Sequence, residues 1–185
     1  QVLWLWRPQE GERFDEAPRK GAGRGVAYWT DGDKKRVIDV TPGYHLVSLD
    51  AETGVPDPDF GQGGIVDLFV GLRNADDPRF PFPDIGLSAA PFVMNDVIVV
   101  GAAHRVGMRP RSKANVKGDI RGFDARTGEL LWTFRTIPER GDYGYESSLG
   151  GGIEFTGNTG VWSPIPGDPE LGHSYLPIED ATGDR

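Results

Sequence analysis

Leu49-Asp50-Ala51-Glu52-Thr53-Gly54 and Phe123-Asp124-Ala125-Arg126-Thr127-Gly128 are two copies of one phrase, an apolar residue followed by Asp-Ala-x-Thr-Gly. Each copy follows a strand-like run, and the second leads into another, Glu129-Leu130-Leu131-Trp132. A strand, a tight turn and a strand that recur at a long interval are typical of repeat proteins. In a β-propeller each such hairpin belongs to one blade, and no blade buries its faces alone. The repeat therefore predicts an all-β fold built of propeller blades.

Short strand-like runs surround both copies of the phrase. Residues 25–54 and 89–134 give the two clearest units of alternating strands and turns, and residues 161–178 read as the start of another unit. The stretches 55–87 and 138–160 are long, loop-like insertions, and loops of that length are more often functional than not. At roughly 40–50 residues per blade, the chain should hold two to three blades, so we expect a partial propeller over 1–185.

Composition narrows the functions that are open to the chain. With 27 glycines and 15 prolines among 185 residues, long helices are disfavoured. The net charge of −8 argues against nucleic-acid binding. The absence of cysteine excludes a disulfide framework and a cysteine-based zinc site. We find no apolar run long enough to span a membrane and no signal peptide, and we expect a processed chain or a piece of a longer one.

The second copy of the phrase extends to Ala125-x-x-Gly128-x-x-x-Trp132. Gly128 allows the positive φ of a tight turn. Four residues later, Trp132 can lie flat across the neighbouring blade, with its indole N–H donating to a backbone carbonyl. We expect Trp132 to be a buried wedge between blades and not a catalytic residue.

This Ala-x-x-Gly-x-x-x-Trp pattern resembles the tryptophan-docking motif of the quinoprotein dehydrogenases, eight-bladed propellers that bind pyrroloquinoline quinone (PQQ). Further segments resemble the same family in the same order, over nearly the whole chain. They look closest to the glucose dehydrogenase-like branch. These segments are Arg24–Trp29, Gly118–Asp124, Thr156–Trp162 and Leu171–Pro177.

The resemblance implies an oxidoreductase that oxidises a sugar or an alcohol, with PQQ taking the hydride and a calcium ion polarising the quinone. PQQ is a planar tricarboxylate, so its site needs an aromatic floor and cationic walls. Trp162 suits the floor, and the forked guanidinium of Arg24 suits a wall. Thr159, in the segment of Trp162, and His104 are further candidate cofactor contacts. A plain core tryptophan and a solvated loop arginine stay open as alternatives.

By the same resemblance, Glu179 and Asp180 stand where some branches carry a calcium ligand, and hard cations prefer such oxygen ligands. The catalytic aspartate of the family belongs to blades beyond Arg185, so we expect the chain alone to be inactive and to need the remaining blades or other chains. The family implies a periplasmic or extracellular location. The basic loop residues between 105 and 117 most simply form a solvated loop; they are Arg105, Arg109, Arg111, Lys113 and Lys117.

Two other functions stay open at this point. The chain could be a non-catalytic propeller-type module that scaffolds or binds a protein partner, for which no stacking tryptophan or cofactor arginine is needed. It could also be a carbohydrate-binding β module that uses Trp29 and the pair Tyr143 and Tyr145, although no specific motif supports that function.

Overall fold

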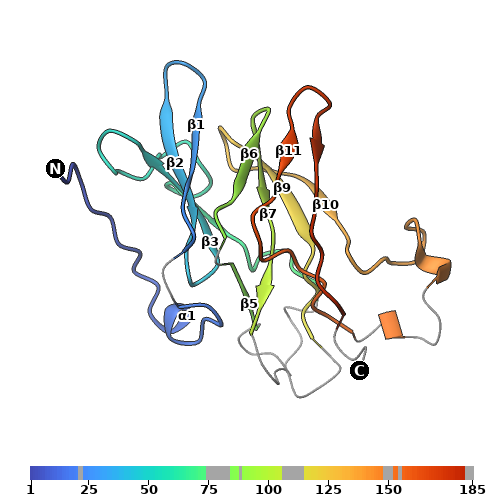
Figure 1. The fold of residues 1–185 in the computed structure, drawn as a ribbon. Coiled ribbons are helices and arrows are strands. Elements are labelled where there is room, and N and C mark those ends of the chain that lie inside the picture. The colour runs from blue at the N-terminus through green and yellow to red at the C-terminus, as the bar shows by residue number, and fades with distance from the viewer. Residues whose placement is uncertain are drawn as a thin grey trace.

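Two four-stranded antiparallel sheets stand side by side in the computed structural model, and each forms one blade (Figure 1). The structure describes residues 1–20, 23–73, 84–87, 89–105, 115–147, 152–153 and 156–181. The first blade has the strand order β1 (Ala27–Thr30), β2 (Lys35–Val40), β3 (His45–Asp50) and β4 (Ile65–Asp67). The second has the order β6 (Phe92–Met94), β7 (Val97–Val100), β9 (Ile120–Asp124) and β10 (Leu130–Phe134).

The remaining elements are short. Two two-stranded pairs accompany the blades: β5 (Ile85–Gly86) with β8 (Ala103–His104), and β11 (Gly167–Asp168) with β12 (His173–Ser174). Helical structure among the described residues is brief, as in α1 (Glu12–Asp15) and the 3-10 turn η1 (Tyr145–Ser147). Among the described residues no helix has the length and apolar character needed to cross a membrane. The prediction of an all-β partial propeller is confirmed.

The two copies of the repeated phrase form equivalent turns. In each, the aspartate Oδ1 accepts hydrogen bonds from two backbone N–H groups and from the threonine hydroxyl, at 2.8–3.1 Å. The closing glycines Gly54 and Gly128 have φ values of 72° and 74°. A side chain is strained at such positive φ, so the pattern Asp-Ala-x-Thr-Gly encodes this turn directly.

The blades are joined through a common apolar core and through buried arginines, of which Arg36 is one. Ile38 and Leu46 of the first blade pack in one cluster with Ile98 and Phe123 of the second. The Arg36 guanidinium donates to the carbonyls of Ala125 and Arg126, both at 2.7 Å. It also forms a buried ion pair with Asp57. The turn at 124–128 is therefore fastened to the first blade.

The matching turn at 50–54 is covered by the N-terminal segment. The Trp4 indole N–H donates to the Ala51 carbonyl at 3.0 Å, and a Cβ on Gly54 would lie 2.5 Å from the Trp4 ring. Residues 1–7 and 129–135 share the pattern Leu-Trp-x-aromatic-Arg. Residues 2–6 alternate in the manner of a strand, but the segment lies outside every described sheet and is held by its tryptophan instead.

The second tryptophan of this kind, Trp132, packs within its own blade. A Cβ on Gly122 of β9 would lie 2.5 Å from Cζ2 and Nε1 of Trp132. The ring is nevertheless 39% exposed, as are all five residues of β10 to a similar degree. The expectation of a buried wedge is wrong for this chain, because β10 is the outermost strand of its blade and the described residues leave Trp132 partly exposed.

Candidate functional site

Arg24 and Trp162, 138 positions apart in the sequence, meet at the surface. The guanidinium carbon of Arg24 lies 5.1 Å from the centre of the Trp162 ring, which is within the range of a cation–π contact. Arg24 is exposed, and Trp162 is 38% exposed. A cation and an aromatic face are thus presented together to solvent.

The backbone that leads to Trp162 is held by very close contacts. Lys117 and Asn158 form a parallel β-bridge, and the Gly118 N–H donates to the Asn158 carbonyl at 2.8 Å. A Cβ on Gly118 would lie 2.6 Å from backbone atoms of Gly160, so no larger residue fits there without a shift. Glycine at position 118 lets this segment approach the backbone of residues 158–160 closely, and this contact fixes the backbone from which Trp162 projects.

Thr159 turns away from the surface. It is buried, has a φ of 58°, and its hydroxyl lies 2.7 Å from that of Thr136. A non-glycine residue with positive φ is uncommon, and the surrounding packing must hold it there. The hydroxyl of Thr159 therefore anchors the loop, and the structure does not bring it to the exposed pair.

His104 and Glu179 meet each other beside the same segment. The buried His104 ring has Nε2 3.1 Å from the Val116 carbonyl and Nδ1 3.4 Å from the Glu179 carboxylate. The Glu179 backbone N–H donates to the Gly160 carbonyl at 3.1 Å. The pair thus ties β8 and the last described segment to the loop before Trp162.

The candidate calcium ligands do not form a metal site in the described part of the chain. Glu179 faces a histidine, and Asp180 is exposed. Among the described residues no three His, Cys, Asp or Glu side chains converge as metal ligands would. Because calcium takes six to eight oxygen ligands, these two carboxylates do not fit a calcium site on their own.

Of the five basic loop residues, Arg105 and Lys117 lie within the described part of the chain, and Arg105 forms an ion pair with Asp84 at 2.7 Å. Arg109, Arg111 and Lys113 lie outside the described residues. The expectation of a solvated loop is wrong for Lys117, which is buried and donates through Nζ to the carbonyls of Ile153 at 2.5 Å and Thr156 at 2.9 Å. Burial, together with the charge of Arg73, lowers the pKa of Lys117. Lys117 therefore holds the insertion in place and does not serve as a free surface cation.

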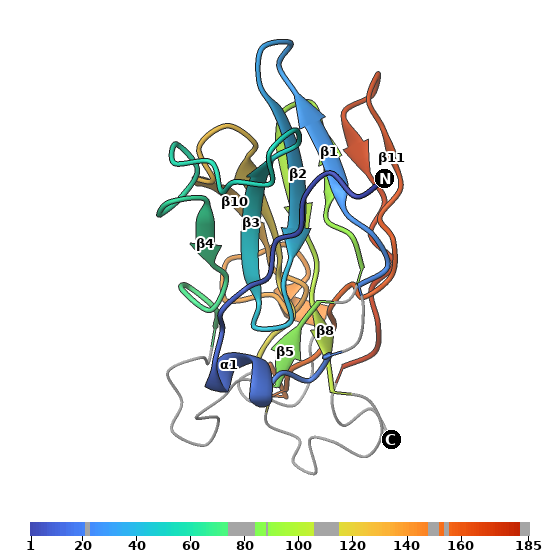
Figure 2. The same ribbon diagram turned by 90° about the vertical axis from the view of Figure 1, so that its left-hand side faces the viewer.

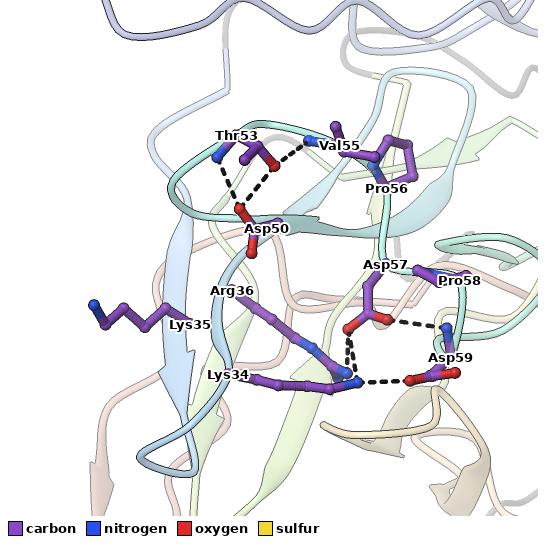
Figure 3. A pocket seen from close by; sticks show the side chains of 10 residues that line it. All are labelled: Lys34, Lys35, Arg36, Asp50, Thr53, Val55, Pro56, Asp57, Pro58 and Asp59. Carbon is purple, nitrogen blue, oxygen red and sulfur yellow. Dashed lines mark hydrogen bonds and ion pairs between the residues drawn. The ribbon is translucent and has the colours of Figure 1, made fainter.

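A pocket of about 480 Å³ lies in the first blade and was not foreseen from the sequence (Figure 3). Its cations are already paired, since Lys34 and Arg36 both reach Asp57 and Lys34 lies 2.7 Å from Asp59. A pocket whose cations are neutralised in this way does not attract an anion. The sequence feature that could have indicated this pocket is Asp57-Pro58-Asp59, which follows the first repeated turn. The full lining is Lys34, Lys35, Arg36, Asp50, Thr53, Val55, Pro56, Asp57, Pro58 and Asp59.

The structure argues against the hypothesis of a carbohydrate-binding module that uses Trp29. Trp29 is only 4% exposed, and its indole N–H donates to the Asp96 carboxylate at 2.9 Å. A sugar platform needs an exposed aromatic face, so the use of Trp29 for this purpose is wrong. Arg36 and Arg126 also lie over its ring, at 5.0 and 5.3 Å from the centre.

Comparison with known proteins gives one consistent result. The sequence profile described as "Glucose/ethanol/alcohol dehydrogenase, beta-propeller domain", of the PQQ type, matches residues 1–185. A glycerol dehydrogenase large subunit from Gluconobacter thailandicus is 30% identical over 97% of this chain and 24% of its own length. A quinate/shikimate dehydrogenase (quinone) from Acinetobacter baylyi is 31% identical over 81% of this chain and 17% of its own length.

Solved structures agree with the sequence relatives. A quinohemoprotein alcohol dehydrogenase from Pseudomonas putida superposes with a TM-score of 0.69 at 26% identity, over 97% of this chain and 24% of that one. The chain thus spans about a quarter of the length of the proteins that it matches.

Proposed function

Because the chain belongs to the β-propeller domain family of the PQQ-dependent glucose, ethanol and alcohol dehydrogenases, we propose that it is a segment of a dehydrogenase that oxidises a sugar or an alcohol. The segment contributes part of the cofactor pocket and not the full catalytic site. In support, its relatives named for glycerol and for quinate or shikimate are dehydrogenases of hydroxyl-bearing compounds.

The contact between Arg24 and Trp162 is the observation that carries this proposal. Its chemistry fits PQQ, because an indole face stacks on a planar conjugated ring and a guanidinium pairs a carboxylate through two hydrogen bonds. When bound, PQQ supplies the acceptor for the hydride. Arg24 holds and orients a carboxylate, and Trp162 excludes water from one ring face. His104, Glu179 and Thr159 hold the loop from which Trp162 projects.

Calcium has no described site in this segment, so no step is derived through it. The proposed location is the periplasm or the extracellular space, as the family resemblance implies. The proposed partners are the sugar or alcohol substrate and the remaining blades, which would cover the exposed strand β10. An unpaired strand edge with exposed apolar side chains is a surface that another strand or blade can cover.

The test measures PQQ binding to the full-length protein that carries this segment, after removal of the cofactor. Arg24→Ala should weaken binding roughly 10- to 100-fold, more at low salt, because a charge-assisted bond is lost. Trp162→Ala should weaken it with little salt dependence. Arg140→Ala, which removes an exposed arginine elsewhere, is the matched control. Unchanged binding in both site variants would overturn the pocket assignment, and a full-length protein that binds no PQQ would favour the non-catalytic scaffold.

A further inference from the structure

Residues 4–13, called the strap below, cross the outer face of the first blade and end in the first turn of α1 (Figure 2). They are fastened at both ends of β3. Trp4 is bound at the turn that follows β3, through the Ala51 carbonyl. Glu10 is bound at the turn that precedes β3, at Thr41–His45. Val47 and Leu49 lie on the face of β3 away from the main core, yet both are buried, as expected for a covered face.

The Glu10 carboxylate accepts hydrogen bonds from three donors. It is 3% exposed, and the donors are the Thr41 hydroxyl at 2.5 Å, the Gly43 N–H at 2.9 Å and the His45 Nδ1 at 2.6 Å. Burial alone would raise the pKa of Glu10. The hydrogen bonds from His45, Thr41 and Gly43 outweigh burial, and the pKa lies below its ordinary value. The strap is therefore held by a carboxylate that is charged at neutral pH.

Arg13 adds a second fastening next to the first. Its guanidinium donates to the Gly43 carbonyl at 2.7 and 3.0 Å and to the Asp67 carboxylate at 2.9 and 3.1 Å. It also lies 3.8 Å from the centre of the Phe69 ring. This ion pair stays formed across neutral pH, because an arginine keeps its charge.

Asp39 of β2 is the unusual group beside this cluster. Burial raises its pKa to about 6, the Val40 N–H lowers it, and the negative charge of Glu10 raises it further. Asp39 is paired in register with Val47, on the face of β3 that the strap covers. Thr41, which binds Glu10, stands two positions after Asp39 on the same strand side, so Asp39 lies beside the Glu10 cluster. Glu10 has three hydrogen-bond donors for its charge, whereas Asp39 has the Val40 N–H.

We propose that Glu10 and Asp39 form a pH-sensitive clasp that holds the strap on the first blade at mildly acidic pH and loosens it at mildly alkaline pH. This goes beyond the proposed function and does not depend on it. Glu10 lies in the part of the chain that leads through Arg19 toward Arg24, and the Arg19 guanidinium donates to the His104 carbonyl at 3.2 Å.

The direction follows from the charges in the cluster. The described charged and titratable groups around the clasp are Glu10 and Arg13 of the strap, Asp39 of β2, His45 of β3 and Asp67 of β4. When Asp39 loses its proton, a second negative charge appears beside Glu10 in a partly buried place. Proton binding by Asp39 and closing of the strap are linked equilibria. A closed strap that raises the proton affinity of Asp39 is itself weakened, by the same factor, when Asp39 is ionised. His45 also contacts Glu10 through Nδ1, so the Asp39→Asn variant is needed to separate the effect of Asp39 from that of the rest of the cluster.

Amide hydrogen exchange of the 185-residue chain at about pH 5 and about pH 8 tests the clasp. The reporters are the amides of residues 13–17, which are bonded within the strap and α1, as in Arg13 N–H to the Glu10 carbonyl at 3.1 Å. After correction for intrinsic exchange, we expect their protection to fall by more than about twofold between the two pH values. Asp39→Asn should remove most of this fall, because an amide cannot ionise.

Two further variants make every outcome informative. Glu10→Gln should lower protection at both pH values, since the charged acceptor is gone. Asp33→Asn makes the same chemical change in an exposed loop and should behave as the unaltered chain. Protection that differs less than about twofold between the pH values would overturn the clasp. An equal fall in Asp39→Asn would overturn the role of Asp39 and assign the response to another group of the cluster.

Discussion

Replacing Gly122 with alanine should loosen the outer strand of the second blade, because the Trp132 ring occupies the place of the new methyl group. The Cβ would stand 2.5 Å from Cζ2 and Nε1 of Trp132, far inside contact distance, and the ring would have to leave. Gly122 lies within β9, so the backbone itself accepts alanine without strain.

The size of the effect follows from the area that the ring loses. A fully buried tryptophan covers about 150–250 Å², and Trp132 is 39% exposed, so roughly 100–150 Å² would return to water. At about 25 cal/mol per Å² this is about 2.5–4 kcal/mol, and the better strand propensity of alanine offsets about 0.5–1 kcal/mol. We expect a net loss of about 2–3 kcal/mol in the free energy of unfolding.

Urea unfolding followed by circular dichroism measures this loss, and a double-mutant cycle isolates its cause. In a Trp132→Ala background, Gly122→Ala should cost almost nothing, because the clash has been removed. Gly152→Ala, with no atom within 4 Å of the new Cβ, should stay within about 0.5 kcal/mol of the unaltered chain. An equal cost of Gly122→Ala with and without the tryptophan would show that the Trp132 ring is not the cause of the loss.

Three other substitutions probe the contacts that hold the first blade. Asp57→Ala strands the buried Arg36 without its carboxylate and should cost about 3–5 kcal/mol in urea unfolding; a loss below about 1 kcal/mol would contradict the buried ion pair. Asp39→Asn should stabilise the chain by up to about 3 kcal/mol at neutral pH but not near pH 3. The pKa of Asp39 is raised to about 6 in the folded chain, so its ionisation destabilises the fold as pH rises from about 4 to 6. An equal effect of the substitution at both pH values would refute this. Trp4→Ala should cost about 1–3 kcal/mol, whereas Leu5→Ala, 75% exposed, should cost little; equal losses would argue against docking by Trp4.

Local chemistry explains what could be predicted from the sequence. The repeated Asp-Ala-x-Thr-Gly phrase specifies its own turn, since the aspartate, the threonine and the positive-φ glycine all act within five residues. Alternating apolar runs around the turns then place the strands. The family resemblance, and not any spacing, led to Arg24 and Trp162, and their roles at a cofactor stay a prediction.

Contacts between distant segments explain what could not be predicted. Trp4 donates to the carbonyl of Ala51, 47 residues away. The alternating sequence around Trp4 looks the same whether the segment docks in this way or pairs as a strand. The sequence places Lys117 in a basic loop. In the structure it is buried and bonded to the carbonyls of Ile153 and Thr156, which lie 36 and 39 residues further along the chain. Trp132 was expected to be buried because a docking motif implies a partner, yet the described residues supply only one side of it.

The most direct test of the central claim is a titration of PQQ into the 185-residue chain, followed by tryptophan fluorescence with and without calcium. If Arg24 and Trp162 form one part of a PQQ pocket, as proposed, binding should be weak. Arg24→Ala and Trp162→Ala should each reduce it further, Arg140→Ala should leave it unchanged, and calcium should add little. Binding that is tight and calcium-dependent, or that is the same in both site variants as in the unaltered chain, would contradict the proposed pocket.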